Sequence, residues 1–183
     1  LCGRGFQLAD IRQRVDEDRG VLKKIQNFVP GFRGYRRRED LRDADRMLRA
    51  QIAGHLGSVR QGLEDSRSLI IGGWNSKELE LLGGVISQLK KVEGQVAHAE
   101  TGYSGFVADI EVKEDQIFRL YDFDASMIDM IGEMRASLDA IRTSLASRDS
   151  VQAQRDILAM RTLINNFESQ FDRRLRVITG TEV

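Results

Sequence analysis

Apolar residues recur at intervals of three and four along most of this chain, and this spacing limits the fold more than any other feature. The clearest run comprises Ile117, Leu120, Met127, Ile131, Met134, Leu138, Ile141 and Leu145. A helix has 3.6 residues per turn, so such residues form one apolar stripe along one side of it. With one proline in 183 residues, long helices are seldom interrupted. The spacing therefore predicts an all-α fold.

Five stripes of this kind predict five helices. Their expected ranges are about 7–28, 37–70, 76–100, 113–146 and 149–179. A helix of 30 residues is roughly 45 Å long, which is more than a compact globule needs. We therefore expect an elongated antiparallel helical bundle or coiled coil, formed as a single unit by residues 1–183. A division into sub-units 1–72 and 76–180 is an alternative.

Details of the stripes lead to further expectations. The third stripe begins at Leu79, and the fifth ends with Leu175 and Ile178. Asp124 occupies a position on the fourth stripe, where a carboxylate must be paired or hydrated. Because the stripes are narrow, we expect some apolar surface to be left for a second copy of the chain.

Three glycines lie in the second predicted helix, at Gly54, Gly57 and Gly62. Each costs roughly 1 kcal/mol relative to alanine inside a helix. We expect them to permit the close approach of a neighbouring backbone; a hinge is the alternative.

The charges balance overall but are unevenly distributed. The chain has 28 Lys and Arg and 28 Asp and Glu; residues 1–38 carry ten basic against four acidic residues, and residues 100–140 carry three against ten. A neutral chain does not indicate general attraction to nucleic acid or acidic lipid. We expect the basic first quarter and the acidic fourth helix to pair, within one molecule or between two copies.

The compartment is predicted from weaker signals. Cys2 is the only cysteine, so no disulfide can form within the chain, and a reducing compartment fits. No apolar run approaches the ~20 residues that cross a bilayer. The sequence therefore predicts a cytoplasmic location.

The most distinctive segment is 29–38, which reads Val-Pro-Gly-Phe-Arg-Gly-Tyr-Arg-Arg-Arg. Pro30 fixes its own φ, and Gly31 and Gly34 accept left-handed conformations, so the segment is predicted to be a compact loop. Its two aromatic residues are expected to anchor the loop on neighbouring helices. Arginine suits planar, two-pronged recognition of carboxylates and phosphates. The candidate contact residues for a partner or an anion are Phe32, Arg33, Tyr35, Arg36, Arg37 and Arg38.

A plainer interpretation of this segment is an ordinary loop between helices. Its arginines would then pair with acids at the start of the next helix, where the helix dipole favours negative charge. Those acids are Glu39, Asp40, Asp43 and Asp45.

Patterns typical of catalytic or metal sites are missing from the sequence. A di-iron bundle needs Glu-x-x-His, but Ile52 and Gln95 stand three residues before His55 and His98. An acidic cluster comprises Glu111, Glu114, Asp115, Asp122, Asp124 and Asp129. Without the glycine-containing loop of a calcium site, it is interpreted as a charged helix face rather than a metal site. The sequence predicts no catalytic residue, cofactor or metal.

Segment 30–38, with the Leu-Arg-Asp-Ala-Asp that follows at 41–45, resembles uncharacterised prokaryotic helical proteins with a Pro-Gly-aromatic-basic-Gly-Tyr loop. The later Gly-Tyr-Ser-Gly-Phe at 102–106 adds to the resemblance. It implies an all-helical fold and carries no activity.

The function expected from the sequence is that of a non-enzymatic scaffold or protein–protein interaction module that self-associates into a homo-oligomer. The alternative is a binder of anionic ligands, either nucleic acid or lipid phosphate on a membrane surface, through the loop at 29–38.

Overall fold

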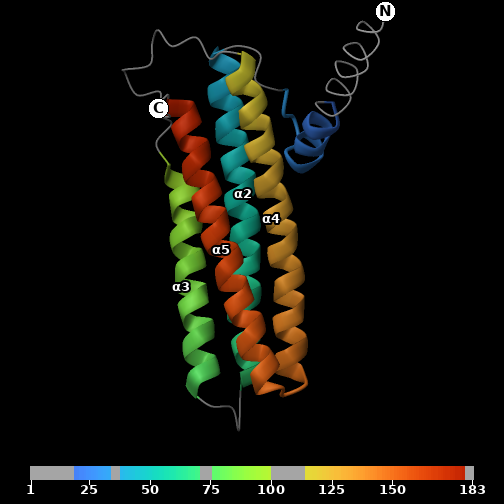
Figure 1. Ribbon diagram of the computed structural model, residues 1–183, viewed down its shortest axis with the longest axis vertical. Helices are drawn as coiled ribbons and strands as arrows, with labels where there is room; N and C mark the ends of the chain where they lie inside the picture. Colours follow the sequence, from blue (N-terminus) through green and yellow to red (C-terminus); the bar gives the residue numbers. More distant parts are fainter. Residues whose placement is uncertain (1–18, 34–37, 71–75, 100–113, 180–183) are drawn as a thin grey trace, which may run out of the picture.

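The computed structural model of the protein describes residues 19–33, 38–70, 76–99 and 114–179. Its long elements are α2 (Arg38–Ser66), α3 (Ser76–His98), α4 (Glu114–Ala146) and α5 (Ser150–Thr179), and the short 3-10 helix η1 (Arg67–Ile70) follows α2 directly (Figure 1). The described residues contain no strand. The prediction of an all-α, elongated bundle is confirmed.

The predicted boundaries of α3, α4 and α5 lie within two residues of the observed ones. The second predicted helix, 37–70, ends earlier, because its last four residues tighten into η1. Of the first predicted helix, 7–28, the described residues 19–28 are helical, and the rest lies outside the described part of the chain.

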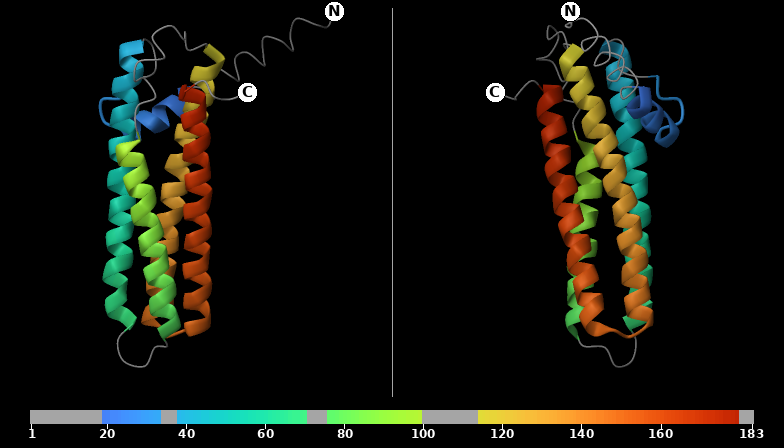
Figure 2. Two further views of the ribbon diagram at one scale, coloured as in Figure 1. Left: turned by 90° about the vertical axis from the view of Figure 1, so that its left-hand side faces the viewer. Right: turned by 45° about the vertical axis from the view of Figure 1, so that its right-hand side comes forward.

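Contacts among the four long helices give their order around the bundle. The packed pairs are α2 with α3, α3 with α5, α5 with α4, and α4 with α2. Figure 2 shows the same arrangement from two further sides, with α2 and α3 forming one hairpin and α4 and α5 the other. The expected antiparallel packing therefore holds within each hairpin.

The two hairpins are packed so that helices from different hairpins run parallel. Gln88 bonds to Asn165 and Lys91 to Glu168, both 77 residues further along the chain, and a constant offset means that α3 and α5 run in the same direction. His55 and Gly62 on α2 contact α4 with a common offset of 80 residues. We call the end where α2 and α4 begin the head of the bundle, and the opposite end the foot.

The apolar stripes pack against one another inside one chain. Residues from every stripe are buried, among them Leu56, Leu89, Ile131 and Phe167. The large apolar side chains left exposed in the described part are Leu69, Leu79, Phe118, Val151 and Leu158. Apart from Leu79, they lie off the predicted stripes. Within the described residues, the stripes therefore leave little apolar surface for a second copy, contrary to the expectation from their narrowness.

Two stripes continue through charged residues rather than the apolar residues expected there. On α3 the buried position is Glu78, and the predicted Leu79 is 45% exposed. On α5 the three-and-four spacing continues from Phe167 and Phe171 to Arg174, which is fully buried, whereas Leu175 is only partly buried. At both places the apolar residue assigned to the stripe is the C-terminal neighbour of the charged residue that is buried.

The glycines of α2 have different surroundings. A Cβ at Gly62 would lie 2.5 Å from Leu138 Cδ2 on α4, so this glycine makes room for a neighbouring side chain and not for the neighbouring backbone that was predicted. A Cβ at Gly57 would lie 3.0 Å from the Glu93 side chain, and one at Gly54 would meet nothing within 4 Å. Close packing therefore explains Gly62 and leaves Gly54 without a structural requirement.

Candidate interaction surface at the head of the bundle

Residues 19–33 form a short arm that lies against α2 and α4 near the head (Figures 1 and 2). The arm is helical over 19–28 and then turns sharply. The N–H of Phe32 donates to the carbonyl oxygen of Val29 at 3.1 Å, and Gly31 has a φ of +84°. Proline second and a left-handed glycine third define a type II turn. The compact loop predicted at the start of segment 29–38 is therefore a specific β-turn.

The turn directs Phe32 into the core, where it is 4% exposed and meets the ring of Tyr121 edge-on at 6.4 Å. Ile25 and Val29 of the same arm are fully buried. Burying a large apolar side chain contributes roughly 1.5–3 kcal/mol. A helix this short is not stable alone in water, so these contacts hold the arm in place. Phe32 is thus the anchor predicted for it, and its burial removes it from the contact surface.

Polar contacts attach the arm to the same two helices. Lys24 Nζ donates to Asp129 Oδ2 on α4 at 2.5 Å. The Phe28 ring lies on that of His55 on α2, with 4.5 Å between centroids. The basic arm and the acidic α4 therefore pair within one molecule, one of the two arrangements expected from the charge distribution.

His55 connects the arm to α4 as well. Arg135 Nη2 donates to His55 Nδ1 at 2.6 Å. Arginine has no acceptor, so Nδ1 must carry a lone pair and the histidine is neutral in this arrangement. Partial burial, together with the nearby charge of Arg135, lowers the pKa of His55 from its usual value of 6.5.

Inside the bundle, near the head, four charged side chains form a buried ion network. Arg174 Nη1 and Nε donate to Asp45 at 2.6 Å and to Asp124 at 2.5 Å, and Asp45 accepts from Arg49 Nε at 2.9 Å. Arg49 Nη1 also donates to the carbonyl oxygens of Val96 (3.3 Å) and Ala99 (2.8 Å), at the end of α3. The network therefore joins all four long helices.

The charges within this network balance, two arginines against two aspartates, and each residue is at least 93% buried. Asp124 was expected to be paired or hydrated, and it is paired. Asp45, Arg49 and Arg174 were not predicted as partners. Their positions at the three-and-four spacing of the stripes of α2 and α5 were the signal that would have found them.

The six candidate contact residues fall into four groups. Phe32 is buried, and Arg33 is exposed. Tyr35, Arg36 and Arg37 lie outside the described residues. Arg38 begins α2, but its side chain is not among those described. The structure thus gives the start of the arginine-rich segment and the helix that follows it.

The acids expected to neutralise these arginines have other partners where they are described. Asp43 accepts from Arg46 at 3.0 Å on the same helix. Asp45 is buried between Arg49 and Arg174. The side chains of Glu39 and Asp40 lie outside the described set. One of the four acids, Asp45, is therefore buried within the bundle, and Asp43 has an exposed partner on its own helix.

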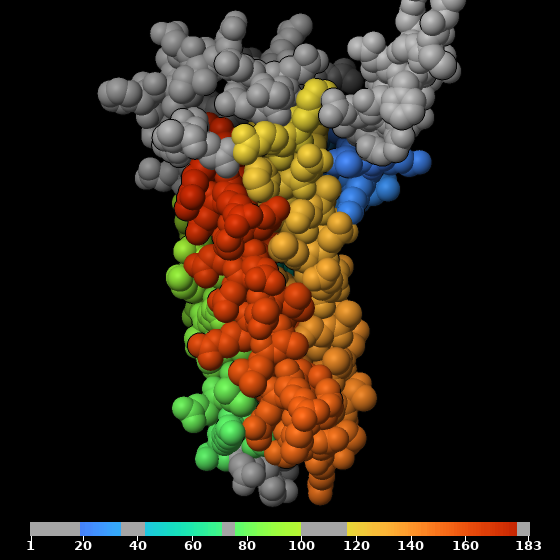
Figure 3. Space-filling view, viewed as in Figure 1, coloured from blue at the N-terminus to red at the C-terminus, as the bar shows by residue number. Residues whose placement is uncertain are grey.

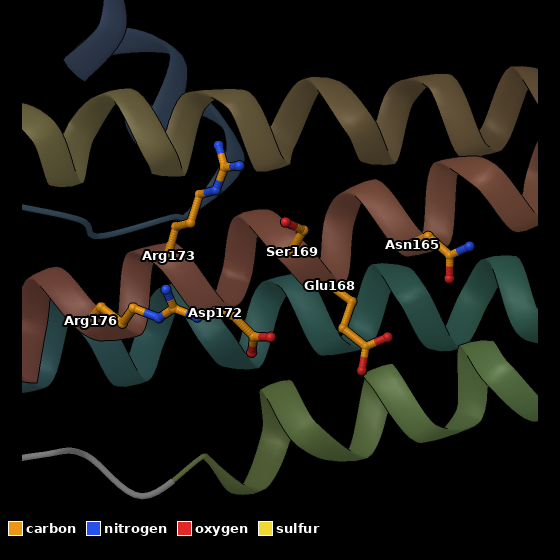
Figure 4. A pocket seen from close by; sticks show the side chains of 6 residues that line it. All are labelled: Asn165, Glu168, Ser169, Asp172, Arg173 and Arg176. Carbon is orange, nitrogen blue, oxygen red and sulfur yellow. The ribbon is translucent and has the colours of Figure 1, made fainter. Parts of the chain in front are cut away.

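A polar hollow of about 410 Å³ lies on the outside of α5 towards the head (Figure 4). Its lining residues are Asn165, Glu168, Ser169, Asp172, Arg173 and Arg176. Figure 4 shows Glu168 and Asp172 pointing towards α3 and Arg173 pointing towards α4. Glu168 is held by Lys91 at 2.8 Å.

A second hollow, of about 230 Å³, lies between α4 and α5 beside Phe123 and Gln170. In Figure 3, α5 fills the middle of this face of the bundle.

The foot contains one buried carboxylate, that of Glu78. Oε1 accepts hydrogen bonds from Ser150 Oγ and from Gln154 Nε2, the latter at 2.7 Å. Oε2 is buried without a partner. The bond from Ser150, aided by that from Gln154, outweighs burial and lowers the pKa of Glu78 below its usual 4.5. Glu78 therefore joins the starts of α3 and α5 as an ionised group.

Within the described residues, no three metal-binding side chains converge, and Asp124 and Asp129 of the acidic cluster are bonded to Arg174 and Lys24. No described helix combines the length and apolar character of a membrane crossing.

Family models, curated proteins and solved structures gave no significant match to this chain.

Proposed function

We propose that this protein is a helical protein–protein interaction module that presents the arginine-rich segment, residues 33–38, to an acidic surface of another chain. Phe32, directly before the segment, is a buried anchor, and the long helix α2 begins at the segment's last residue, Arg38. A short basic segment is thus flanked on both sides by elements of the bundle. Holding a binding segment between fixed points lowers the entropy lost when it binds.

The observation that carries this proposal is that acids near the segment already have partners within the bundle. Asp45 is buried between Arg49 and Arg174, which takes it away from the segment, and Asp43 shares an exposed bond with Arg46. Fewer acids then remain beside the segment to neutralise it. Arginine binds carboxylates in a planar, two-pronged manner, so an acidic protein surface suits it. A second copy of this chain is one such partner, through the exposed acids of α4.

The experiment compares wild type with a variant in which Arg33, Arg36, Arg37 and Arg38 are alanine. A matched control replaces four exposed arginines of the body, Arg67, Arg155, Arg161 and Arg173, which alters the net charge equally. Static light scattering over a concentration series measures self-association, and titration with poly-L-glutamate measures binding to an acidic chain. We expect binding in wild type and the control, and its loss in the segment variant.

Two outcomes contradict the proposal. One is a strict monomer that does not bind poly-L-glutamate at low salt. The other is equal loss of binding in the segment variant and the control, which would show a general charge effect. The anion alternative is tested in parallel with a single-stranded oligonucleotide and with anionic vesicles at two salt concentrations. Binding of these ligands alone, lost in the segment variant, would favour the alternative.

A further inference from the structure

The arm that precedes the arginine-rich segment is fastened to the bundle through a titratable group. His55 touches two elements at once, Phe28 of the arm by its ring face and Arg135 of α4 by Nδ1. It lies under the last turn of the arm helix, just before the turn that carries Phe32. A change at His55 therefore acts on the arm and on α4 together.

Protonation of His55 would act on the atom that makes the contact. Because Nδ1 accepts from Arg135, the neutral ring carries its proton on Nε2, and a second proton must go to Nδ1. That proton removes the acceptor and places two cations 2.6 Å apart. The geometry alone makes this contact incompatible with a charged histidine.

Among the residues that the structure describes, the other charged groups nearby do not restore the balance. The arm contributes Lys24, and α4 contributes Asp129, which Lys24 already neutralises at 2.5 Å, as well as Arg135. On α2, the residues three and four positions from His55 are Gln51, Ile52, Ser58 and Val59, none of which carries charge. Protonated His55 would thus face an unbalanced positive charge, consistent with the lowered pKa of the neutral group.

We propose that residues 19–33 form a pH-sensitive arm, docked on α2 and α4 while His55 is neutral and released when His55 takes up a proton. Release breaks the Arg135 contact and the packing of Phe28, and it frees the turn that positions Arg33. The consequence for partner binding rests on the proposed function, because the arm sets where the arginine-rich segment begins. Release itself depends only on contacts within one chain.

The test measures hydrogen exchange by mass spectrometry, corrected for intrinsic rates, at about pH 7.5 and about pH 5.5, on either side of the ordinary histidine pKa. In wild type we expect the protection of amides 20–32 to fall by up to about tenfold at the lower pH, while the central turns of α3 and α5 keep theirs. His55→Gln cannot titrate and keeps the arm protected at both values. His55→Lys is permanently charged and leaves it unprotected at both.

His98 supplies the matched control, since it is the other histidine and lies exposed at the end of α3. His98→Gln should behave as wild type. The proposal is overturned if wild-type protection of the arm is the same at both pH values, if it falls equally in His55→Gln, or if the whole bundle loses protection with it. The measurement uses no partner, so failed arm release and failed partner binding are distinguished.

Discussion

The two ends of the bundle bury charge in opposite ways. At the head, two arginines and two aspartates neutralise one another and reach all four helices. At the foot, a single carboxylate, Glu78, is held by the neutral donors Ser150 and Gln154 and keeps one oxygen without a partner. Removing one member of a buried charged network leaves the charge of its partner uncompensated, whereas a lone charge with neutral partners can be replaced by a neutral group. The head should therefore be the more sensitive end.

The largest effect is expected at Arg174. Replacing it with methionine removes the cation that bonds to both Asp124 and Asp45 inside the bundle, and removing one partner of a buried ion pair costs about 3–5 kcal/mol of unfolding free energy. Arg174→Met should lower the urea midpoint accordingly. Arg173→Met, at the exposed neighbouring position, should change the unfolding free energy by less than about 0.5 kcal/mol.

A double variant tests whether charge balance explains the sensitivity of the head. The double variant Asp124→Leu/Arg174→Met removes one charge of each sign and leaves the Asp45–Arg49 pair intact. Because no excess buried charge remains, we expect it to recover about 2 kcal/mol or more of the loss. A double variant no more stable than Arg174→Met alone would refute charge balance as the explanation.

At the foot, Glu78→Gln should cost about 1–2 kcal/mol, because the charge-assisted bonds are lost while a carbonyl acceptor remains. Since the pKa of Glu78 is lowered on folding, its stabilisation is complete above the usual value of 4.5 and is lost as the pH falls through the folded-state value. The difference between wild type and Glu78→Gln should therefore shrink in acid. Glu80→Gln, at an exposed neighbour, provides the baseline. If Glu78→Gln lost as much unfolding free energy as Arg174→Met, the predicted difference between head and foot would be wrong.

The smallest effects are expected between the ends, in the apolar body. Gly62→Ala brings a methyl group within 2.5 Å of Leu138 Cδ2, the end of a side chain that can turn, so an overpacking cost of about 1–2 kcal/mol opposes a gain of up to about 1 kcal/mol in helix propensity. Gly54→Ala meets open space and should gain about 0.5–1 kcal/mol. Thermal unfolding of the pair checks both signs. Stabilisation by Gly62→Ala would show that α2 and α4 are packed less closely than the structure indicates.

The helices followed from local pattern because three-and-four spacing reflects the geometry of one helix. The ranges of α3, α4 and α5, the need of Asp124 for a partner and the anchoring of Phe32 were all open to prediction. Which residue is buried at the end of each stripe was harder to predict. Leu79 and Leu175 were favoured because they are apolar, although the spacing itself passes through Glu78 and Arg174. At both positions the charged residue is buried, and the apolar residue next to it is exposed or only partly buried.

By itself, the sequence determined an all-helical rod, since each stripe can be buried only against another stripe. Which stripes meet was decided by the tertiary structure. The connection between α3 and α4 joins helices that are not neighbours, so α3 runs parallel to α5 and α2 to α4. That arrangement brings together Asp45, Arg174 and Asp124, residues separated by 50 to 129 positions. Their partnership depends on helix order in space, which local spacing does not encode.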